Sequence, residues 1–248
     1  MLTDDQLLQY SRHLMLPEVD AAGQACWLNS SVLIVGLGGL GSPVALYLAT
    51  AGVGKLLLVD DDRVELSNLQ RQIIHTQARI DEYKVDSAKH AIADVNPLTQ
   101  VEAFPERLEE SRMQELVASV DLVIDCSDNF KTRHALNRVC RAQLKPLVSG
   151  AAIRFEGQVS VFDPRVPEAP CYECLYPPDS SVEQNCSNSG VFAPLVGIVG
   201  TIQAAEALKV LANVGQPSVG RLLLIDALRM EFHTVKLPKK SSCEVCGD

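Results

Sequence analysis

Length, composition and charge set broad limits for this chain of 248 residues. Hydrophobic residues make up 47% of it and charged residues 21%, which is ordinary globular composition. The formal net charge is −9, and such an acidic chain is a poor nucleic-acid binder because phosphate neutralisation supplies most of that affinity. The longest apolar stretch, residues 191–202, is too short for a bilayer, which needs about 20 residues.

The start of the chain and its eight cysteines indicate a reducing compartment. Residues 1–5 are acidic where a secretory signal would be basic, so we expect a cytoplasmic protein. A chain of this length can fold without disulfides, and paired cysteines then suggest metal binding or catalysis. Because no linker separates two folding units, we expect a single domain over residues 1–248.

Strand and helix patterns alternate over the first 150 residues. A capping box that starts at Thr3 predicts a helix over 4–14, and a second helix is expected over 19–29. The alternation that follows is typical of a parallel, doubly wound α/β sheet. The expected strands are 31–35, 55–59, 99–104, 121–125 and 146–148, and the helices between them are 41–51, 83–95, 111–119 and 130–143.

The pattern changes after residue 150. Residues 157–162 alternate as an antiparallel strand does, and a polar loop follows over 177–190. A helix of small residues is expected over 194–213, and strands over 220–226 and 230–237 close the chain. We expect these strands to extend the same sheet, which gives a Rossmann-like fold with an antiparallel extension.

A glycine-rich turn connects the first predicted strand to its helix. Gly36, Gly38 and Gly41 form G-x-G-x-x-G, which permits a tight turn and close approach of phosphate to a helix N-terminus. Asp60 ends the next strand, where a carboxylate can bind ribose hydroxyls. These features indicate an adenosine-nucleotide site, and a turn that merely packs a helix on a strand is the alternative. An NAD-dependent oxidoreductase and a non-enzymatic scaffold are the competing functions.

The segment after Asp60 points to a family. Residues 60–72 follow D-x-D-x-V-x-x-S-N-L-x-R-Q, which resembles the ubiquitin-activating superfamily, whose bacterial members adenylate sulfur-carrier proteins. The resemblance covers essentially the whole chain and is nearest to the molybdopterin branch, with the thiamine-pathway branch as the alternative. Further matches are Lys84, residues 127–129, 149–152, 156–158 and 190–194, and two C-x-x-C pairs.

The resemblance implies ATP-dependent adenylation of the C-terminal glycine carboxylate of a ubiquitin-like carrier that ends in Gly-Gly. Both reactants are anionic, and the family pattern places Arg71 and Lys84 on the triphosphate. It gives Asp128 a role in binding Mg²⁺ and places Asn129 beside the nucleotide. A separate sulfurtransferase or cysteine desulfurase would supply the sulfur. The other implied nucleotide-binding residues are Gly36, Gly38, Gly39, Gly41, Asp60, Asp62, Ser67, Asn68, Leu69 and Gln70.

Two further residues acquire roles through the resemblance. Arg12 would reach the ATP of a neighbouring subunit as an arginine finger, which implies a homodimer, and a solvated helix residue is the alternative. Cys186 lies in the polar loop at the position of the superfamily's reactive cysteine. It is therefore a candidate for a thiol adduct with the carrier, with a bystander thiol as the alternative.

Four other cysteines form two pairs. Cys171 and Cys174 make one C-x-x-C pair, Cys243 and Cys246 make the other, and family members match at both. Four thiolates suit a structural Zn²⁺, whereas redox pairs or unrelated thiols are the alternatives. The remaining cysteines, Cys26, Cys126 and Cys140, are expected to pack in the core.

Overall fold

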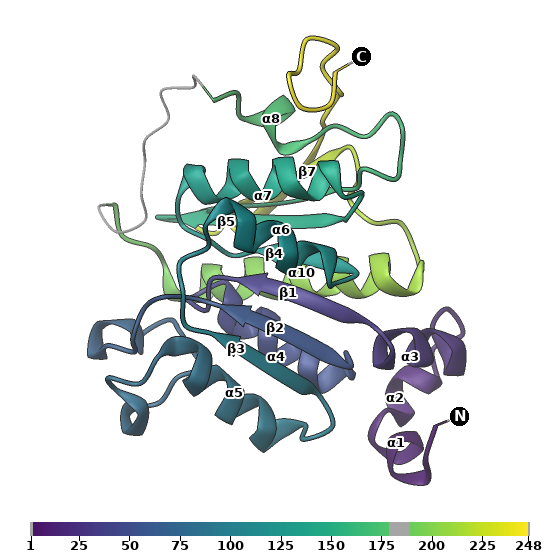
Figure 1. Cartoon of the computed structure of the whole chain (residues 1–248), viewed down its shortest axis with the longest axis vertical. Coiled ribbons are helices and arrows are strands. Elements are labelled where there is room, and N and C mark those ends of the chain that lie inside the picture. The colour runs from purple at the N-terminus through teal and green to yellow at the C-terminus, as the bar shows by residue number, and fades with distance from the viewer. Residues whose placement is uncertain (1, 179–188, 248) are drawn as a thin grey trace.

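A single eight-stranded sheet runs through the computed structural model, which describes residues 2–178 and 189–247 (Figure 1). Its strand order is β3-β2-β1-β4-β5-β6-β7-β8. Neighbours from β3 to β5 pair in parallel, and those from β5 to β8 pair antiparallel, which confirms the expected mixed sheet. The strands are β1 (Ser31–Val35), β2 (Lys55–Val59), β3 (Gln100–Phe104), β4 (Leu122–Asp125), β5 (Leu147–Ile153), β6 (Glu156–Phe162), β7 (Arg221–Asp226) and β8 (Glu231–Lys236).

Helices cover both faces of the parallel part. Helices α4, α5 and α10 pack on one face, and α6 and α7 pack on the other. The helices are α1 (Asp4–Gln9), α2 (Ser11–Leu14), α3 (Asp20–Leu28), α4 (Gly41–Ala51), α5 (Lys84–Val95), α6 (Glu110–Ala118), α7 (Phe130–Ala142), α8 (Tyr172–Leu175) and α10 (Ala193–Ala212), with 3₁₀ turns η1 (Leu66–Asn68) and η2 (Gln77–Arg79).

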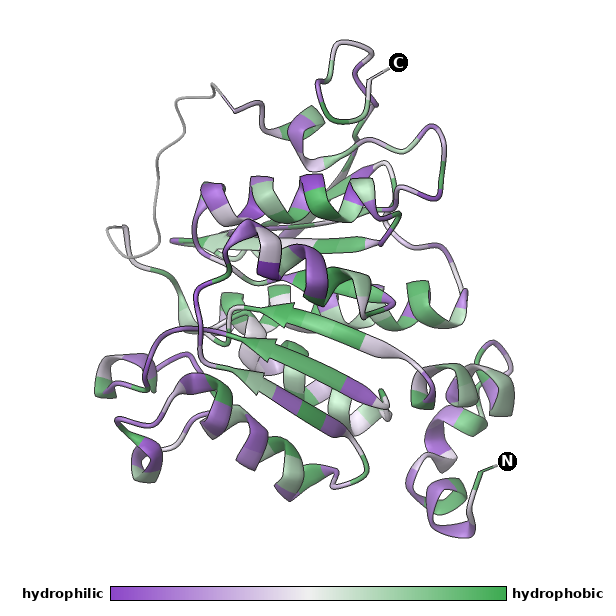
Figure 2. Cartoon of the chain, in the orientation of Figure 1, coloured by the Kyte–Doolittle hydropathy of each residue, from purple (hydrophilic) through white to green (hydrophobic). Residues whose placement is uncertain are grey.

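The apolar run of β1 is explained by burial on both faces. Val32 and Ile34 contact the layer of α4, α5 and α10, whereas Leu33 and Val35 face α6 and α7. Side chains alternate between the faces of a strand, so a strand covered on both sides needs apolar residues at every position. Figure 2 shows this as hydrophobic colouring along most of β1 and β2, with more polar colouring on helices α5, α6 and α7.

The glycine-rich turn lies where the chain changes direction around β1. The chain passes from β1 to β2 and β3 on one side of β1, and then crosses to β4 on its other side. The connections therefore diverge at the carboxyl end of β1, and open α/β sheets bind ligands at such a point. Gly36 has φ +94°, and a Cβ there would approach the carbonyl oxygen of Cys126 to 2.7 Å. Only glycine fits this position, because the turn packs directly on the segment that follows β4.

Three sequence expectations need correction. The helix expected over 4–14 is broken at Tyr10, whose side chain is buried and whose hydroxyl accepts a hydrogen bond from Asn96 Nδ2 at 2.9 Å. Strand β5 continues to Ile153 rather than ending at 148, because antiparallel pairing with β6 stabilises its small residues. Cys26 is exposed rather than in the core, because α3 buries the face formed by Gly23, Gln24 and Trp27.

Helix α10 is the one described helix long and apolar enough to cross a membrane by length and composition alone. It is longer than the apolar stretch noted in the sequence, and half of it is buried in this fold. It contacts α4, β5 and β6, and the polar side chain of Gln203 is buried among them. Packing within the fold therefore accounts for its apolar composition.

Candidate nucleotide site

A cleft of about 420 Å³ lies at the carboxyl ends of β1, β2 and β4. It is formed by the glycine-rich turn, the segment after β2, the start of α5 and the segment after β4. These regions are far apart along the chain, and the fold brings them together at one edge of the sheet. The expected nucleotide-binding residues that line the cleft are Gly36, Gly38, Gly39, Asp60, Asp62, Asn68, Arg71, Lys84, Asp128 and Asn129.

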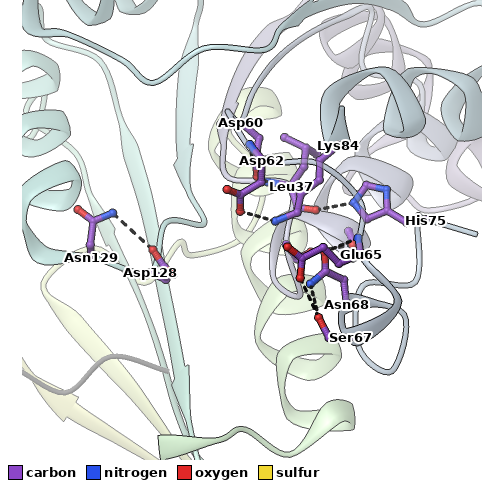
Figure 3. A network of polar contacts seen from close by, with 12 residues as sticks. Leu37, Asp60, Asp62, Glu65, Ser67, Asn68, His75, Lys84, Asp128 and Asn129 are labelled. Carbon is purple, nitrogen blue, oxygen red and sulfur yellow. Dashed lines mark hydrogen bonds and ion pairs between the residues drawn. The ribbon is translucent and has the colours of Figure 1, made fainter. Parts of the chain in front are cut away.

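Asp60 holds the glycine-rich turn. Its Oδ2 accepts a hydrogen bond from the backbone N–H of Leu37 at 2.7 Å, and its Oδ1 accepts one from the N–H of Asp62 at 2.9 Å (Figure 3). Burial raises the pKa of Asp60, against the opposing effect of the nearby Lys84 charge. Each carboxylate oxygen has further lone pairs, so contact with a ribose stays a prediction beside this structural role.

Lys84 supplies a buried positive charge. It is the first residue of α5, only 5% of the residue is exposed, and its Nζ contacts Asp62 Oδ2 at 2.6 Å. The side chain of Asp62 is 66% exposed, so this carboxylate can move into solvent while the ammonium stays in the cleft. An entering anion could therefore replace Asp62 as the partner of Lys84, since a buried charge requires one.

Asn68 and Arg71 come from the segment around η1. Asn68 is buried, and its Oδ1 accepts a hydrogen bond from the N–H of Glu65 at 3.1 Å, which leaves its amide nitrogen near Ser67 Oγ at 3.4 Å (Figure 3). Arg71 is half-buried and donates through Nη1 to the carbonyl oxygen of Ser67 at 3.3 Å. The guanidinium has five donors, so further contacts with an anion remain available.

Asp128 and Asn129 lie on the other side of the cleft, after β4 (Figure 3). Asp128 is exposed, and its Oδ1 accepts a hydrogen bond from Asn129 Nδ2 at 3.4 Å. Asn129 is the N-cap of α7, where its Oδ1 accepts from the N–H of Thr132 at 2.9 Å. A cap satisfies a backbone donor that the helix leaves unpaired, so Asn129 also has a structural role.

Packing constrains two of the expected glycines. A Cβ on Gly41 would come within 1.9 Å of the carbonyl oxygen of Gly36, so this glycine is needed for packing inside the turn. A Cβ on Gly39 would meet Val196 of α10 at 2.8 Å, so packing requires this glycine too, although it lines the cleft.

Arg12 is exposed on α2, away from the cleft, and Cys186 is outside the described residues. Ser67, Leu69 and Gln70 are near the cleft in sequence but do not line it.

Two cleft arginines were missed by the sequence analysis. Arg107 follows β3, and Arg133 of α7 donates to the carbonyl oxygen of Ser127 at 2.7 Å. Arg133 also lies 3.8 Å from the buried carboxylate of Asp125. The position of Arg107 after the carboxyl end of a parallel strand was a usable signal, because ligands bind at that edge. The role of Arg133 depends on a contact with β4 that periodicity does not reveal.

His75 lies buried beneath the glycine-rich turn. Its Nε2 is 2.9 Å from the carbonyl oxygen of Leu37 (Figure 3). Its Nδ1 is 2.9 Å from Ser87 Oγ in α5. A carbonyl can only accept, so Nε2 carries the proton and Nδ1 accepts from the Ser87 hydroxyl. Burial lowers the pKa of His75 to about 4, with smaller effects of the same sign from Lys84 and Arg79.

Acid is expected to destabilise the protein through His75. The unfolded chain takes up a proton at this residue near the ordinary histidine pKa of about 6.5, whereas the folded chain does so near 4. The unfolded state binds more protons in that window, so the free energy of unfolding falls as pH drops from about 6.5 towards 4. The free energy of unfolding, measured with denaturant across this pH range, should fall less steeply for His75→Gln than for the wild type. Equal slopes in the two proteins would contradict the effect assigned to His75.

The four paired cysteines meet at one place. Cys171 Sγ is 3.5 Å from Cys243 Sγ, Cys174 Sγ is 3.3 Å from Cys246 Sγ, and all four sulfurs lie within 4.8 Å of one another. A tetrahedral Zn²⁺ with sulfur ligands at about 2.3 Å spaces them by about 3.8 Å, which falls within this spread. Burial raises the pKa of Cys171 to about 11, so a thiolate at this position would be stabilised by a bound cation. The donor set therefore fits zinc.

Comparison with known proteins identifies the family. The model of the ThiF family matches residues 10–245. The chain belongs to the ThiF family. It is 45% identical to the molybdopterin-synthase adenylyltransferase of Salmonella typhimurium, over 99% of this chain and 98% of that protein. It is 43% identical to the sulfur carrier protein ThiS adenylyltransferase of Escherichia coli, over 99% and 97% of the two chains.

Solved structures confirm the fold of this ThiF-family chain. The crystal structure of Escherichia coli MccB with ATP superposes with a TM-score of 0.85 at 23% identity, over 96% of this chain and 74% of that one. A likeness at this identity concerns the fold. The family match and the two adenylyltransferases are what connect the cleft to chemistry.

Proposed function

We propose that this protein uses ATP and Mg²⁺ to adenylate the C-terminal glycine carboxylate of a small ubiquitin-like sulfur carrier. The observation that carries the proposal is the cleft itself. It places Arg71 and Lys84 on the side of the glycine-rich turn and Asp128 across from them. Membership of the ThiF family and 45% identity to a protein named as such an adenylyltransferase support it.

The reaction needs positioning and charge rather than a covalent intermediate. A carboxylate oxygen of the carrier attacks the α-phosphorus of ATP, the bond to the bridging oxygen breaks, and pyrophosphate leaves with that oxygen. Lys84 and Arg71 would neutralise the β- and γ-phosphates, as their positions in the cleft allow. Asp128 is the residue that would hold Mg²⁺, which when bound shields the phosphate charge. Orientation of the two reactants supplies the remaining acceleration.

A second cavity of about 410 Å³ offers the carrier tail a route. It lies over β5 to β8 and shares Asp128, Arg133 and Ala152 with the nucleotide cleft. The small side chain of Ala151 leaves room for a narrow chain in its wall. A Gly-Gly tail in this cavity would therefore end beside Asp128, where the α-phosphate is expected.

Two carriers, of the molybdopterin and thiamine pathways, are the candidate substrates. Identities of 45% and 43% to the molybdopterin and thiamine relatives are close, and we favour the small subunit of molybdopterin synthase as the carrier. A sulfurtransferase or cysteine desulfurase would then provide the sulfur that attacks the acyl-adenylate. The cytoplasmic location expected from the sequence stays a prediction, as does a structural zinc on the four cysteines.

Carrier-dependent exchange of labelled pyrophosphate into ATP tests the function directly. Exchange should require Mg²⁺ and a carrier that ends in Gly-Gly, and it should disappear with a carrier that lacks the last glycine. The molybdopterin and thiamine carriers are compared in parallel to assign the pathway. Folded, zinc-loaded protein that supports no exchange with any such carrier would refute the proposal, and tight NADH binding without ATP binding would revive the oxidoreductase alternative.

Arg12 is proposed to act in a homodimer. It lies away from its own chain's cleft, on the exposed face of α2. Large apolar side chains are exposed beside it, with Leu8 77% and Met15 71% accessible. Apolar surface of this kind favours burial against another chain, and in the homodimer that the family resemblance implies Arg12 would reach the neighbour's ATP.

Cys186 is expected to be dispensable for adenylation. Since the attack on ATP uses the carrier carboxylate, Cys186→Ser should keep pyrophosphate exchange within about twofold of the wild type. A thiol adduct with the carrier, sought by intact-protein mass spectrometry without reductant, should be absent from the variant if this cysteine forms one. Loss of exchange in the folded variant would instead place the thiol in the adenylation step.

A further inference from the structure

Leu37 is held at both of its backbone groups by side chains from elsewhere in the chain. Its N–H donates to Asp60 Oδ2 at 2.7 Å, and its carbonyl oxygen accepts from His75 Nε2 at 2.9 Å (Figure 3). Its own side chain is fully buried, and glycines precede and follow it. Glycines make a segment conformationally free, so these two bonds restrict a turn that would otherwise sample many states.

His75 also connects this turn to the helix that carries the buried lysine. Its Nδ1 accepts from Ser87 Oγ at 2.9 Å, and Ser87 is fully buried in α5, one turn after Lys84. The imidazole thus bridges the peptide of the turn and the first turn of α5. Its lowered pKa keeps it neutral near pH 7, so both bonds persist with a single tautomer.

We propose that His75 is a positioning residue for the nucleotide. It holds the glycine-rich turn and the start of α5 in one arrangement, so that the backbone of the turn and Lys84 meet the same triphosphate. This inference rests on the proposed function. His75 itself is buried behind the turn and acts through Leu37 and Ser87.

Two substitutions separate the hydrogen bond from the shape of the side chain. His75→Phe keeps a ring without a donor, whereas the amide of His75→Gln can still donate to Leu37. We expect His75→Phe to raise the Kd and KM for Mg²⁺-ATP about tenfold, as the loss of one buried hydrogen bond would, with kcat within about threefold. His75→Gln should recover most of that loss.

A matched core variant controls for stability. Met113→Ala removes a buried side chain on the opposite face of the sheet and should leave the Kd for ATP unchanged. Equal ATP affinity in wild type and folded His75→Phe would overturn the proposal. The proposal would also be overturned if Met113→Ala, with the same unfolding midpoint as His75→Phe, lost as much ATP affinity. If His75→Phe does not fold, Ser87→Ala decides: a threefold rise in Kd, roughly, supports the proposal, and an unchanged Kd overturns it.

The proposed function and this inference fail in different ways. Wild-type protein that binds no ATP would refute the function itself. Wild-type protein that binds ATP, beside a His75→Phe variant that binds it equally well, would refute only the role of His75.

Discussion

Asp128→Ala is expected to fold normally and to lower carrier-dependent pyrophosphate exchange by at least about 100-fold. The carboxylate is exposed at the cleft and bonded to Asn129 Nδ2 at 3.4 Å, so its removal leaves the buried part of the fold untouched. It is also the carboxylate shared by the nucleotide cleft and the neighbouring cavity, where Mg²⁺ and the α-phosphate are proposed to lie. Exchange kinetics and the thermal unfolding midpoint are measured on the same preparation.

Asp61→Ala is the matched control for Asp128→Ala. Asp61 is another exposed aspartate that lines the same cleft, on the side of β2. Its loss changes the net charge equally, so we expect exchange within about fivefold of the wild type if position rather than charge matters. Exchange by Asp128→Ala at a rate close to that of the wild type would remove the magnesium assignment.

Removal of zinc is expected to destabilise the protein while ATP binding survives. Cys171 is the N-cap of α8 and Cys174 lies within this helix, whereas Cys243 and Cys246 lie near the end of the chain. When the free metal concentration is 100 times its Kd for the folded state, metal binding adds about 2.7 kcal/mol to the free energy of unfolding. In a chain of this size that corresponds to roughly 5–10 °C in the unfolding midpoint. The cluster lies outside the residues that line the nucleotide cleft, so the Kd for ATP should change little.

Two cysteine variants make the zinc experiment specific. Cys174→Ser removes a buried member of the cluster and should lose the metal, measured as zinc per chain by elemental mass spectrometry. Cys26→Ser removes an exposed cysteine on α3 and should keep both metal and midpoint. A Cys174→Ser protein that is as stable and as active as the wild type, without zinc, would exclude the structural role.

The cluster is tied to the nucleotide site through α7. The N–H of Tyr172 donates to Asn137 Oδ1 at 2.9 Å, and Glu173 Oε1 accepts from Arg138 Nε at 2.9 Å. Both partners belong to the helix that Asn129 caps at the cleft. Loosening of the cysteine pairs would therefore reach the cleft through this helix, so its effect on ATP binding should be smaller than its effect on stability.

Much of the cleft could be predicted because its signals are local. The turn at Gly36 and the carboxylate of Asp60 each follow a buried strand, and Lys84 starts a helix, so periodicity and chain order placed them at one sheet edge. Arg133 escaped prediction because its position in the cleft depends on packing of α7 against β4. Residues 179–188 include Cys186 and lie outside the described part of the chain, so its role remains a prediction.

Local sequence patterns were enough to predict the order of strands and helices, the place of the glycine-rich turn and the two C-x-x-C pairs. These features depend on residues within a few positions of one another. Packing between distant segments was needed to show that, within the expected four-cysteine cluster, Cys171 lies beside Cys243, 72 residues away, that Tyr10 interrupts a helix to reach Asn96, and that His75 holds Leu37. Such contacts depend on how distant segments pack, because the same short pattern can be buried or exposed according to what the rest of the chain places against it.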